Sequence, residues 1–408
     1  MKTTTTQITL SDLVESRYNY SNNLVVGFNE NDNNPFHKLY QDCVSGKIHS
    51  DNKQKIMAGS YSYLGMGDNL RVQEAVKKTI EQYGVSSQGS RVLTGSTQVH
   101  RDLETGLASF IGGEDSILFP TGWSTNFSTI NALFGPGDTI INDLKNHNSI
   151  QIGVHTSGAK TVTFNAERPS TLERAFKKAE GATLVVIDSI FSMDGTIAPL
   201  PEILEVCKRN DAYLMVDEAH SLGVLGKTGR GITEHFGIDP KEIDLLMGTC
   251  SKALAGSGGY IVAKKEIIEF LRYRANGYIF SGAVPAYTAA SSLESIRVLD
   301  ENPELVTELQ NRYTYFRKNL EGLGLKIIGD NTPIVPVIYP NEDAAVEATQ
   351  HMWDNGVFIV PAMYPAVSRK TPRLRFSITL NHSYEDLDYI IKTLQDIRPN
   401  EGLIDLTD

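Results

Sequence analysis

The chain has 408 residues, a formal net charge of −11 and three cysteines. This length exceeds one compact core, so we expect two domains, and the negative charge argues against a nucleic-acid or anionic-membrane surface. The cysteines are too few and too widely spaced for a disulfide framework, and the nine histidines show no metal-binding spacing, so we expect no metal. No stretch approaches the roughly 18 apolar residues of a membrane span, and the N-terminus lacks an apolar signal core, so we expect a cytoplasmic protein.

Residues 1–55 are polar and rich in asparagine. We expect them to form an N-terminal arm, with a short helix at Asp12–Tyr18 and a loop at Asn29–Asn34. From residue 56 onward, short apolar runs alternate with helical patterns such as Thr171–Ala179 and Ile203–Asn210. This alternation predicts an α/β fold, with a large domain over residues 56–285 built on a mostly parallel seven-stranded sheet. The expected strands are Ser116–Phe119, Thr139–Asn142, Thr161–Phe164, Leu184–Asp188, Tyr213–Asp217, Leu245–Gly248 and Gly259–Val262.

After residue 285 the pattern changes to a smaller α+β domain over residues 286–408. A long helical region passes through Leu299 and Leu320. We expect further helices at Ala344–Trp353 and Tyr384–Leu394. The expected strands of this domain are Leu325–Ile328, Ile334–Tyr339, Phe358–Val360 and Leu374–Thr379.

Polar residues end several strands of the predicted large sheet. Asp188, Asp217 and Thr249 come at the carboxyl ends of apolar runs, where α/β sheets bind ligands. His220 follows Asp217 by three residues, and Lys252 follows Thr249 by three. An Asp-x-x-His pair alone could be a metal pair, a helix cap or a surface pair. The loop that carries Lys252 is followed by a glycine-rich segment and another apolar run. This context favours a cofactor-binding site over those three alternatives.

Together these residues are the set that pyridoxal phosphate chemistry needs. The Lys252 amine can form a Schiff base with the cofactor aldehyde, and the Asp217 carboxylate can keep the pyridine nitrogen protonated. The His220 imidazole can bond the phenolic oxygen, and hydroxyls beside the lysine can hold the phosphate. These residues alone would suit an aminotransferase equally well.

Three local patterns are not interpreted as functional sites. Gly226-Lys227-Thr228 lacks the earlier glycine of a phosphate-binding loop, because Ser221 stands in its place. The glycine-rich segment at residues 256–259 precedes a strand and so is not a dinucleotide fingerprint. Asn126-Phe127-Ser128 matches a glycosylation acceptor, which has no meaning without secretion.

With these residues assembled, the chain resembles the α-oxoamine synthase family of fold-type-I pyridoxal phosphate enzymes. The resemblance covers roughly residues 34–394. The segment Gly59–Gly65 looks most like the serine palmitoyltransferase branch of that family. The other segments that carry the resemblance are Gly89-Ser90-Arg91, Thr121-Gly122-Trp123, Phe191-Ser192-Met193-Asp194-Gly195, Gly229-Arg230-Gly231 and Arg373-Leu374-Arg375.

The resemblance implies a role for each candidate site residue. It makes Lys252 the Schiff-base lysine, with Asp217 on the pyridine nitrogen and His220 on the ring phenolate. His147 would stack on the ring, although by itself it reads as an ordinary loop histidine. The phosphate would be bound by Thr121, Gly122, Trp123, Ser192 and Thr249.

The substrate side follows from the same resemblance. Arg375 would bind the carboxylate of the amino acid by a bidentate fork, with Arg373 as the competing candidate and a surface arginine as the alternative. Tyr61 and Ser62 stand near the expected substrate. A homodimer is implied, in which Ser281 reaches the phosphate of the neighbouring subunit.

The implied reaction is a decarboxylative condensation of a small amino acid, serine first, with an acyl thioester to give an α-amino ketone. The donor could be an acyl-CoA or an acyl group on a carrier protein. Lys264, Lys265, Arg272 and Arg274 form the nearest basic cluster, which we interpret as a solvated helix face. A non-catalytic partner subunit is the other alternative, against which the presence of Lys252 and Asp217 argues.

Overall fold

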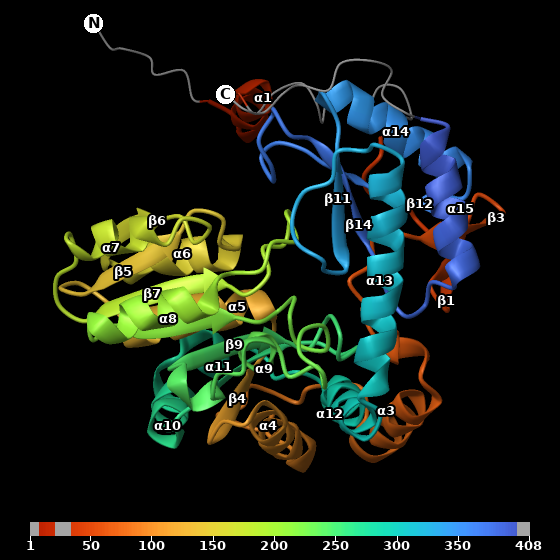
Figure 1. Ribbon diagram of the computed structural model, residues 1–408. Helices are drawn as coiled ribbons and strands as arrows, with labels where there is room; N and C mark the ends of the chain where they lie inside the picture. The colour runs from red at the N-terminus through yellow and green to blue at the C-terminus, as the bar shows by residue number, and fades with distance from the viewer. Residues whose placement is uncertain (1–7, 21–33, 398–408) are drawn as a thin grey trace, which may run out of the picture.

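The computed structural model describes residues 8–20 and 34–397 (Figure 1). Its centre is a seven-stranded sheet in the order β4-β10-β9-β8-β7-β5-β6, parallel except that β10 runs antiparallel to both neighbours. The predicted α/β fold with a mostly parallel sheet is confirmed. The strands are β4 (Asp115–Phe119), β5 (Thr139–Asp143), β6 (Lys160–Phe164), β7 (Thr183–Asp188), β8 (Tyr213–Asp217), β9 (Leu245–Thr249) and β10 (Gly259–Ala263).

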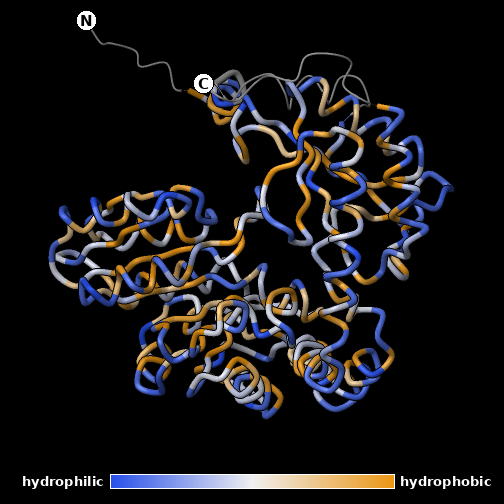
Figure 2. Tube along the Cα trace, in the orientation of Figure 1, coloured by the Kyte–Doolittle hydropathy of each residue, from blue (hydrophilic) through white to orange (hydrophobic). Residues whose placement is uncertain are grey.

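Helices cover both faces of this sheet, so its strands are apolar on both sides. In β7, Val185 and Ile187 join one buried cluster, whereas Leu184 and Val186 join another on the opposite face. Figure 2 shows the apolar colour concentrated along these strands. The helices of this part are α4 (Gln98–Ile111), α5 (Gly122–Leu133), α6 (Asn148–Ser157), α7 (Ser170–Phe176), α8 (Leu200–Arg209), α9 (Ile232–Phe236), η2 (Pro240–Glu242), α10 (Lys265–Arg274) and α11 (Asn276–Ile279).

The C-terminal part forms a second, smaller layer of sheet and helices. Strands β11 (Ile334–Ile338), β14 (Arg373–Ser377) and β13 (Pro361–Ala362) pair antiparallel in that order. Helices α14 (Glu342–Asp354) and α15 (Tyr384–Gln395) belong to this part, and α13 (Glu304–Gly322) runs from it toward the large sheet (Figure 1). The smaller α+β part is therefore present as predicted.

Two expected strands of this part differ from prediction. Leu325–Ile328 is not a strand: within it only Ile327 forms a bridge, to Val337, and that bridge is isolated. The segment is bounded by Gly324 and Gly329, which both have positive φ. Of the run predicted at Phe358–Val360, only Phe358 is in a strand, at the end of β12 (Val357–Phe358), and β13 begins just after the run, at Pro361, in a different sheet.

The N-terminal region contains strands that were not predicted. After α1 (Leu10–Tyr20), residues 42–57 form β1 (Asp42–Val44), β2 (Lys47–Ser50) and β3 (Lys53–Met57), and β3 pairs in parallel with β12. These strands were missed because each is only three to five residues long and contains few apolar residues. The loop predicted at Asn29–Asn34 lies outside the described residues apart from its last residue.

Two sets of contacts bear on the domain limits. In the first set, β3 pairs with β12 of the C-terminal part. In the second, helix α12 (Ala286–Glu301) packs on α4 and on α3 (Leu70–Tyr83). Helix α3 follows the short helix η1 (Met66–Asp68). Arg71 of α3 lies 2.8 Å from Glu294 and 2.5 Å from Glu301 of α12. We therefore propose that the limits predicted at residues 55 and 285 move, so that residues 42–57 join the C-terminal part and α12 the large domain. None of the helices in the described ranges is long and apolar enough to span a bilayer.

Candidate active site

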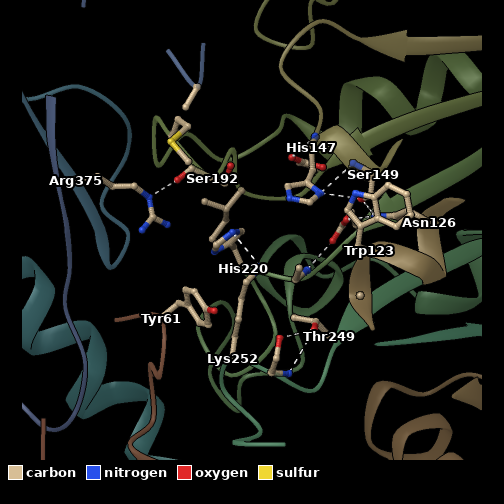
Figure 3. Close-up of a pocket in the computed structure, with 18 of the residues that line it drawn as sticks. Tyr61, Trp123, Asn126, His147, Ser149, Ser192, His220, Thr249, Lys252 and Arg375 are labelled. Atoms are coloured by element: carbon tan, nitrogen blue, oxygen red, sulfur yellow. Dashed lines mark hydrogen bonds between the residues drawn. The ribbon is translucent and has the colours of Figure 1, made fainter. Parts of the chain in front are cut away.

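A cavity of about 580 Å³ opens at the carboxyl ends of β7, β8 and β9 (Figure 3). All the candidate site residues predicted from sequence line it except Ser62 and Ser281. The ones that line it are Tyr61, Thr121, Gly122, Trp123, His147, Ser192, Asp217, His220, Thr249, Lys252 and Arg375. The topology therefore brings together residues that lie far apart in the sequence.

Lys252 and His220 lie side by side in the middle of the cavity. Lys252 Nζ is 3.0 Å from His220 Nε2, and His220 Nδ1 is 2.7 Å from the hydroxyl of the buried Tyr63. Burial lowers the pKa of Lys252 to about 8, and the Arg375 charge adds to this while Asp217 and Asp188 oppose it. Burial, then the Lys252 charge, lowers the pKa of His220 well below its ordinary value. The imidazole is therefore neutral, and an appreciable fraction of the lysine is a free amine near neutral pH.

Asp217 ends β8 and is held by two donors. The Asn126 side-chain amide donates to Oδ2 at 2.7 Å, and the backbone N–H of Ala219 donates to Oδ1 at 2.9 Å. The same Asn126 nitrogen lies 2.9 Å from the Ser149 hydroxyl. These contacts fix the orientation of the carboxylate, which faces the cavity. Figure 3 shows Asn126, Ser149 and His147 grouped on this side of the site.

His147 precedes α6 and is anchored by its own loop. Its Nδ1 lies 2.7 Å from the Ser149 hydroxyl, and its backbone N–H donates to Asp188 at 3.1 Å. Asp188 is paired in register with Asp217 on the neighbouring strand. Burial, with the charge of Asp217 next, raises the pKa of Asp188 well above its ordinary value. Asp188 therefore supports the His147 backbone from the neighbouring strand, and its burial favours the neutral form.

The N-terminus of α5 forms another edge of the cavity. The Thr121 side chain accepts from the Ser124 N–H and caps the helix. The first N–H groups of an α-helix have no partner within the helix, so those of Gly122 and Trp123 are available to an anion. The hydroxyl of Thr249 lies 2.9 Å from that of Ser251 at the end of β9. This edge can bind a phosphate group.

Arg375 and Arg373 lie two residues apart on β14 but differ in their contacts. Arg375 lines the cavity, donates through Nε to the Ser192 carbonyl and bonds the Ser377 hydroxyl at 2.9 Å. Arg373 is 4 % exposed and is paired with Asp194 at 2.5 Å, outside the cavity lining. Of the two arginines, Arg375 is therefore the one placed to bind a carboxylate in the cavity.

Several residues of the site or in contact with it were not singled out from the sequence. Asn126 was noted only as part of a glycosylation pattern, yet it lies one helical turn after Gly122 on the same face of α5. Tyr63 belongs to the segment 59–65, but it contacts His220, which is 157 positions away in the chain, so the sequence does not indicate this contact. The C-terminal part adds Val360, Pro361, Ala362 and Ala366, which were not predicted to line the site.

Ser62 and Ser281 lie outside the cavity. Ser62 belongs to the turn between Tyr61 and Gly65, in which the Gly65 N–H donates to the Ser62 carbonyl. Ser281 follows α11, next to Phe280, whose side chain is 81 % exposed. The described residues bring together no cluster of three histidine, cysteine or acidic side chains able to hold a metal ion.

Comparison with known proteins defines the class first. Residues 53–394 match the aminotransferase class I and II family, and the chain belongs to that family. The 8-amino-7-oxononanoate synthase of Thermoanaerobacter pseudethanolicus is 36% identical over 87% of this chain and 90% of its own length. The serine palmitoyltransferase of Sphingobacterium spiritivorum is 35% identical over 84% and 86%. A solved serine palmitoyltransferase with pyridoxal phosphate covers 92% of this chain and 98% of its own, with 30% identity and a TM-score of 0.87.

These relatives narrow the class to pyridoxal-phosphate-dependent acyltransferases of the α-oxoamine synthase type. The predicted family, fold-type-I architecture and cofactor are confirmed. The residues of the cavity fit this cofactor on their own chemistry. A partly buried amine with a lowered pKa, a fixed carboxylate and the free N–H groups of a helix N-terminus match an aldehyde, a pyridine nitrogen and a phosphate.

Proposed function

We propose that this cavity condenses a small amino acid with an acyl thioester, releasing the thiol and carbon dioxide and leaving an α-amino ketone. Serine is the first candidate amino acid, before alanine and glycine, because the segment 59–65 looks most like the serine palmitoyltransferase branch. The observation that carries the proposal is the meeting of Lys252, His220, Asp217 and Arg375 in one cavity. The first three serve a cofactor, and Arg375 remains for a substrate carboxylate.

Each residue has a proposed part in holding the cofactor. Asp217 pairs with the pyridine nitrogen, His220 bonds the ring oxygen and His147 stacks on the ring. The phosphate is bound by the N-terminus of α5 with hydroxyls of Thr121, Ser192 and Thr249. When bound, pyridoxal phosphate supplies an aldehyde for the Lys252 amine and an electron-withdrawing ring.

Lys252 is the proposed base that takes the proton from the α-carbon of the amino acid. With a pKa lowered to about 8, the amine is free often enough to accept a proton at neutral pH. His220 Nε2, at 3.0 Å, holds the Lys252 Nζ in place. Arg375 fixes the carboxylate, so that the α-carbon faces the lysine and not bulk water.

The alternatives are an aminotransferase and a non-catalytic partner subunit. We would incubate the holoenzyme with serine, alanine or glycine and acyl-CoA donors, and measure thiol and carbon dioxide release. Both products are expected. Exchange of amino and keto acids without thiol release would identify an aminotransferase, and a protein that takes up no cofactor would be a non-catalytic subunit.

The proposal includes a homodimer whose sites are completed by the neighbouring chain. Ser281 lies outside its own cavity, beside apolar side chains of high exposure on the same surface: Phe280 is 81 % exposed and Leu93 is 79 % exposed. The two loops are joined, because the N–H of Ala283 bonds the Gly89 carbonyl. This arrangement supports a second copy of the chain as the partner that receives Ser281.

The source of the acyl group and the cellular location also belong to the proposal. An acyl-carrier protein would need a basic surface. The basic cluster of Lys264, Lys265, Arg272 and Arg274, on and next to α10, has less free positive charge than the sequence suggests. Arg272 is not a solvated side chain as predicted, since it pairs with Asp115 at 3.1 Å and Glu104 at 3.4 Å. This counts against a carrier protein docking on α10. The free cysteines Cys43, Cys207 and Cys250 support a cytoplasmic location.

A further inference from the structure

The cavity has two walls of different chemistry. The wall formed by the strand ends carries the carboxylates and imidazoles described above. The opposite wall comes from the C-terminal part and consists of Val360, Pro361, Ala362 and Ala366 around Arg375, with Met193 adjoining. Figure 3 shows Arg375 on this side, across the cavity from His147 and Trp123. Apart from that single guanidinium, this wall carries no charged group: its polar side chains are the hydroxyls of Ser192 and Tyr61, and the others are apolar.

The two cations in the cavity lining, Lys252 and Arg375, are both already assigned. On the proposed function, Lys252 serves the cofactor and Arg375 binds the carboxylate of the amino acid. A second carboxylate on the other substrate would therefore need a further cation.

Four other cations of the described chain, on segments adjoining the site, lie outside the lining, and three of them are engaged in ion pairs. Arg373 and Lys145 share Asp194, at 2.5 Å and 2.7 Å. Arg369 pairs with Glu342 at 3.3 Å and lies 4.3 Å from the centre of the Tyr364 ring. Lys370 is exposed on the same loop and does not line the cavity.

From this distribution of charge we infer that the acyl donor has an uncharged, apolar tail, and that donors ending in a carboxylate are rejected. The inference rests on the proposed function. A carboxylate brought against this wall would lose water without gaining a partner, which is strongly unfavourable. An alkyl tail would instead remove apolar surface from water.

The inference separates two relatives that sequence identity does not separate. The product named for one, 8-amino-7-oxononanoate, is itself a carboxylate, whereas the palmitoyl group named for the other carries no charge. Their identities to this chain are 36% and 35%. The apolar wall places this chain with the uncharged acyl group.

A matched pair of donors tests the inference. We would compare octanoyl-CoA with the mono-CoA thioester of octanedioic acid, which has the same chain length, and measure thiol release by the holoenzyme with serine, alanine and glycine. The kcat/KM for octanoyl-CoA should be higher by about tenfold or more. Equal or better turnover of the carboxylate-ended donor would overturn the inference and leave the proposed function standing. No thiol release from either donor would instead contradict the proposed function.

A pair of variants tests whether the missing cation is the cause. Ala366 is exposed at the cavity lining, so it can be changed to a long side chain without disturbing the core. Ala366→Arg should shift the ratio of the two kcat/KM values toward the carboxylate-ended donor by about tenfold, whereas the uncharged Ala366→Gln should not. Calorimetric binding of the two donors should show the same shift. An unchanged ratio in Ala366→Arg would mean that charge does not set the preference, and the inference would fall.

Discussion

Single residues in this protein show how burial sets the charge state of a catalytic group. Glu218 is buried and Lys252 is partly buried, and in each case burial disfavours the charged form. For the lysine this means a lowered pKa, and for the glutamate a raised one. The two effects have opposite signs and can be measured separately.

Lys252 should react with the cofactor at a lower pH than an ordinary lysine. Only the neutral amine attacks an aldehyde, and the pKa of Lys252 is lowered to about 8. The rate at which the apoprotein binds pyridoxal phosphate covalently should therefore rise with pH and level off above about 8. The measurement is the absorbance change on mixing, followed over pH. Lys252→Ala should keep the fold by circular dichroism and form no adduct that borohydride traps. A rate that keeps rising toward about 10.4 would show an ordinary lysine pKa.

Glu218 should make the apoprotein less stable as the pH rises. Its Oε1 is buried without a partner, Oε2 accepts from Ser221 at 3.0 Å, and burial raises its pKa to about 8. Between the ordinary value and about 8 the folded chain binds more protons at this group than the unfolded chain, so this group lowers the free energy of unfolding as pH increases. Glu218→Gln removes that loss while keeping the shape.

The comparison is thermal unfolding of wild type and Glu218→Gln at several pH values. The stability advantage of the variant should grow as pH rises and level off above about 8, at an order of magnitude of 2 kcal/mol or more. All other ionisable groups are common to both proteins and cancel in the difference. A difference that is flat over this range would place the pKa of Glu218 at its ordinary value.

At the scale of elements, the turn that carries Asp194 contacts both walls of the cavity. Asp194 lies two residues after Ser192 and binds Arg373 at 2.5 Å and Lys145 at 2.7 Å. Arg373 precedes Arg375 by two residues, and Lys145 precedes His147 by two. A single carboxylate therefore holds both β14, which carries Arg375, and the loop that carries His147. We expect Asp194 to position both.

Asp194→Asn tests this tie, and Glu167→Gln is its matched control. Asparagine leaves Arg373 buried without a counter-ion, which should lower the free energy of unfolding by roughly 3 kcal/mol. Because β14 shifts, the KM for the amino acid should rise about tenfold while kcat changes less. Glu167 is the other partner of Lys145, at 2.8 Å, but makes no contact with Arg373. Equal effects of the two changes on KM would show that the Asp194–Arg373 pair does not position Arg375.

At the scale of the whole molecule, the proposed dimer predicts complementation between inactive chains. Ser281→Asp should repel the phosphate in the neighbouring site, and Lys252→Ala should disable its own site. In a mixed dimer the site with an intact lysine receives an intact Ser281 from the other chain. Subunit exchange should therefore restore roughly a quarter of wild-type activity. Two variants that stay inactive after verified exchange, or an active monomer in sedimentation, would contradict the shared site.

Much of this architecture follows from local patterns that the sequence carries by itself. The strands of the large sheet are short apolar runs bounded by polar ends, and a strand buried on both faces must have that pattern. Asp217 and Thr249 end such runs, so their convergence at one edge of the sheet follows from parallel topology. The cofactor chemistry follows from the same residues, because a carboxylate, an imidazole and a lysine in this order have few other uses.

Tertiary structure alone decided the parts that depend on long-range contacts. Residues 42–57 form strands because β12, some 300 positions later, offers β3 an edge to pair with. Arg373 and Arg375 look equivalent in sequence, and only the place of Asp194 in space engages the first and leaves the second to the cavity. The pKa values of Lys252 and Glu218 and the apolar substrate wall have the same origin. Burial and proximity are properties of the packed chain, and no local pattern of residues specifies them.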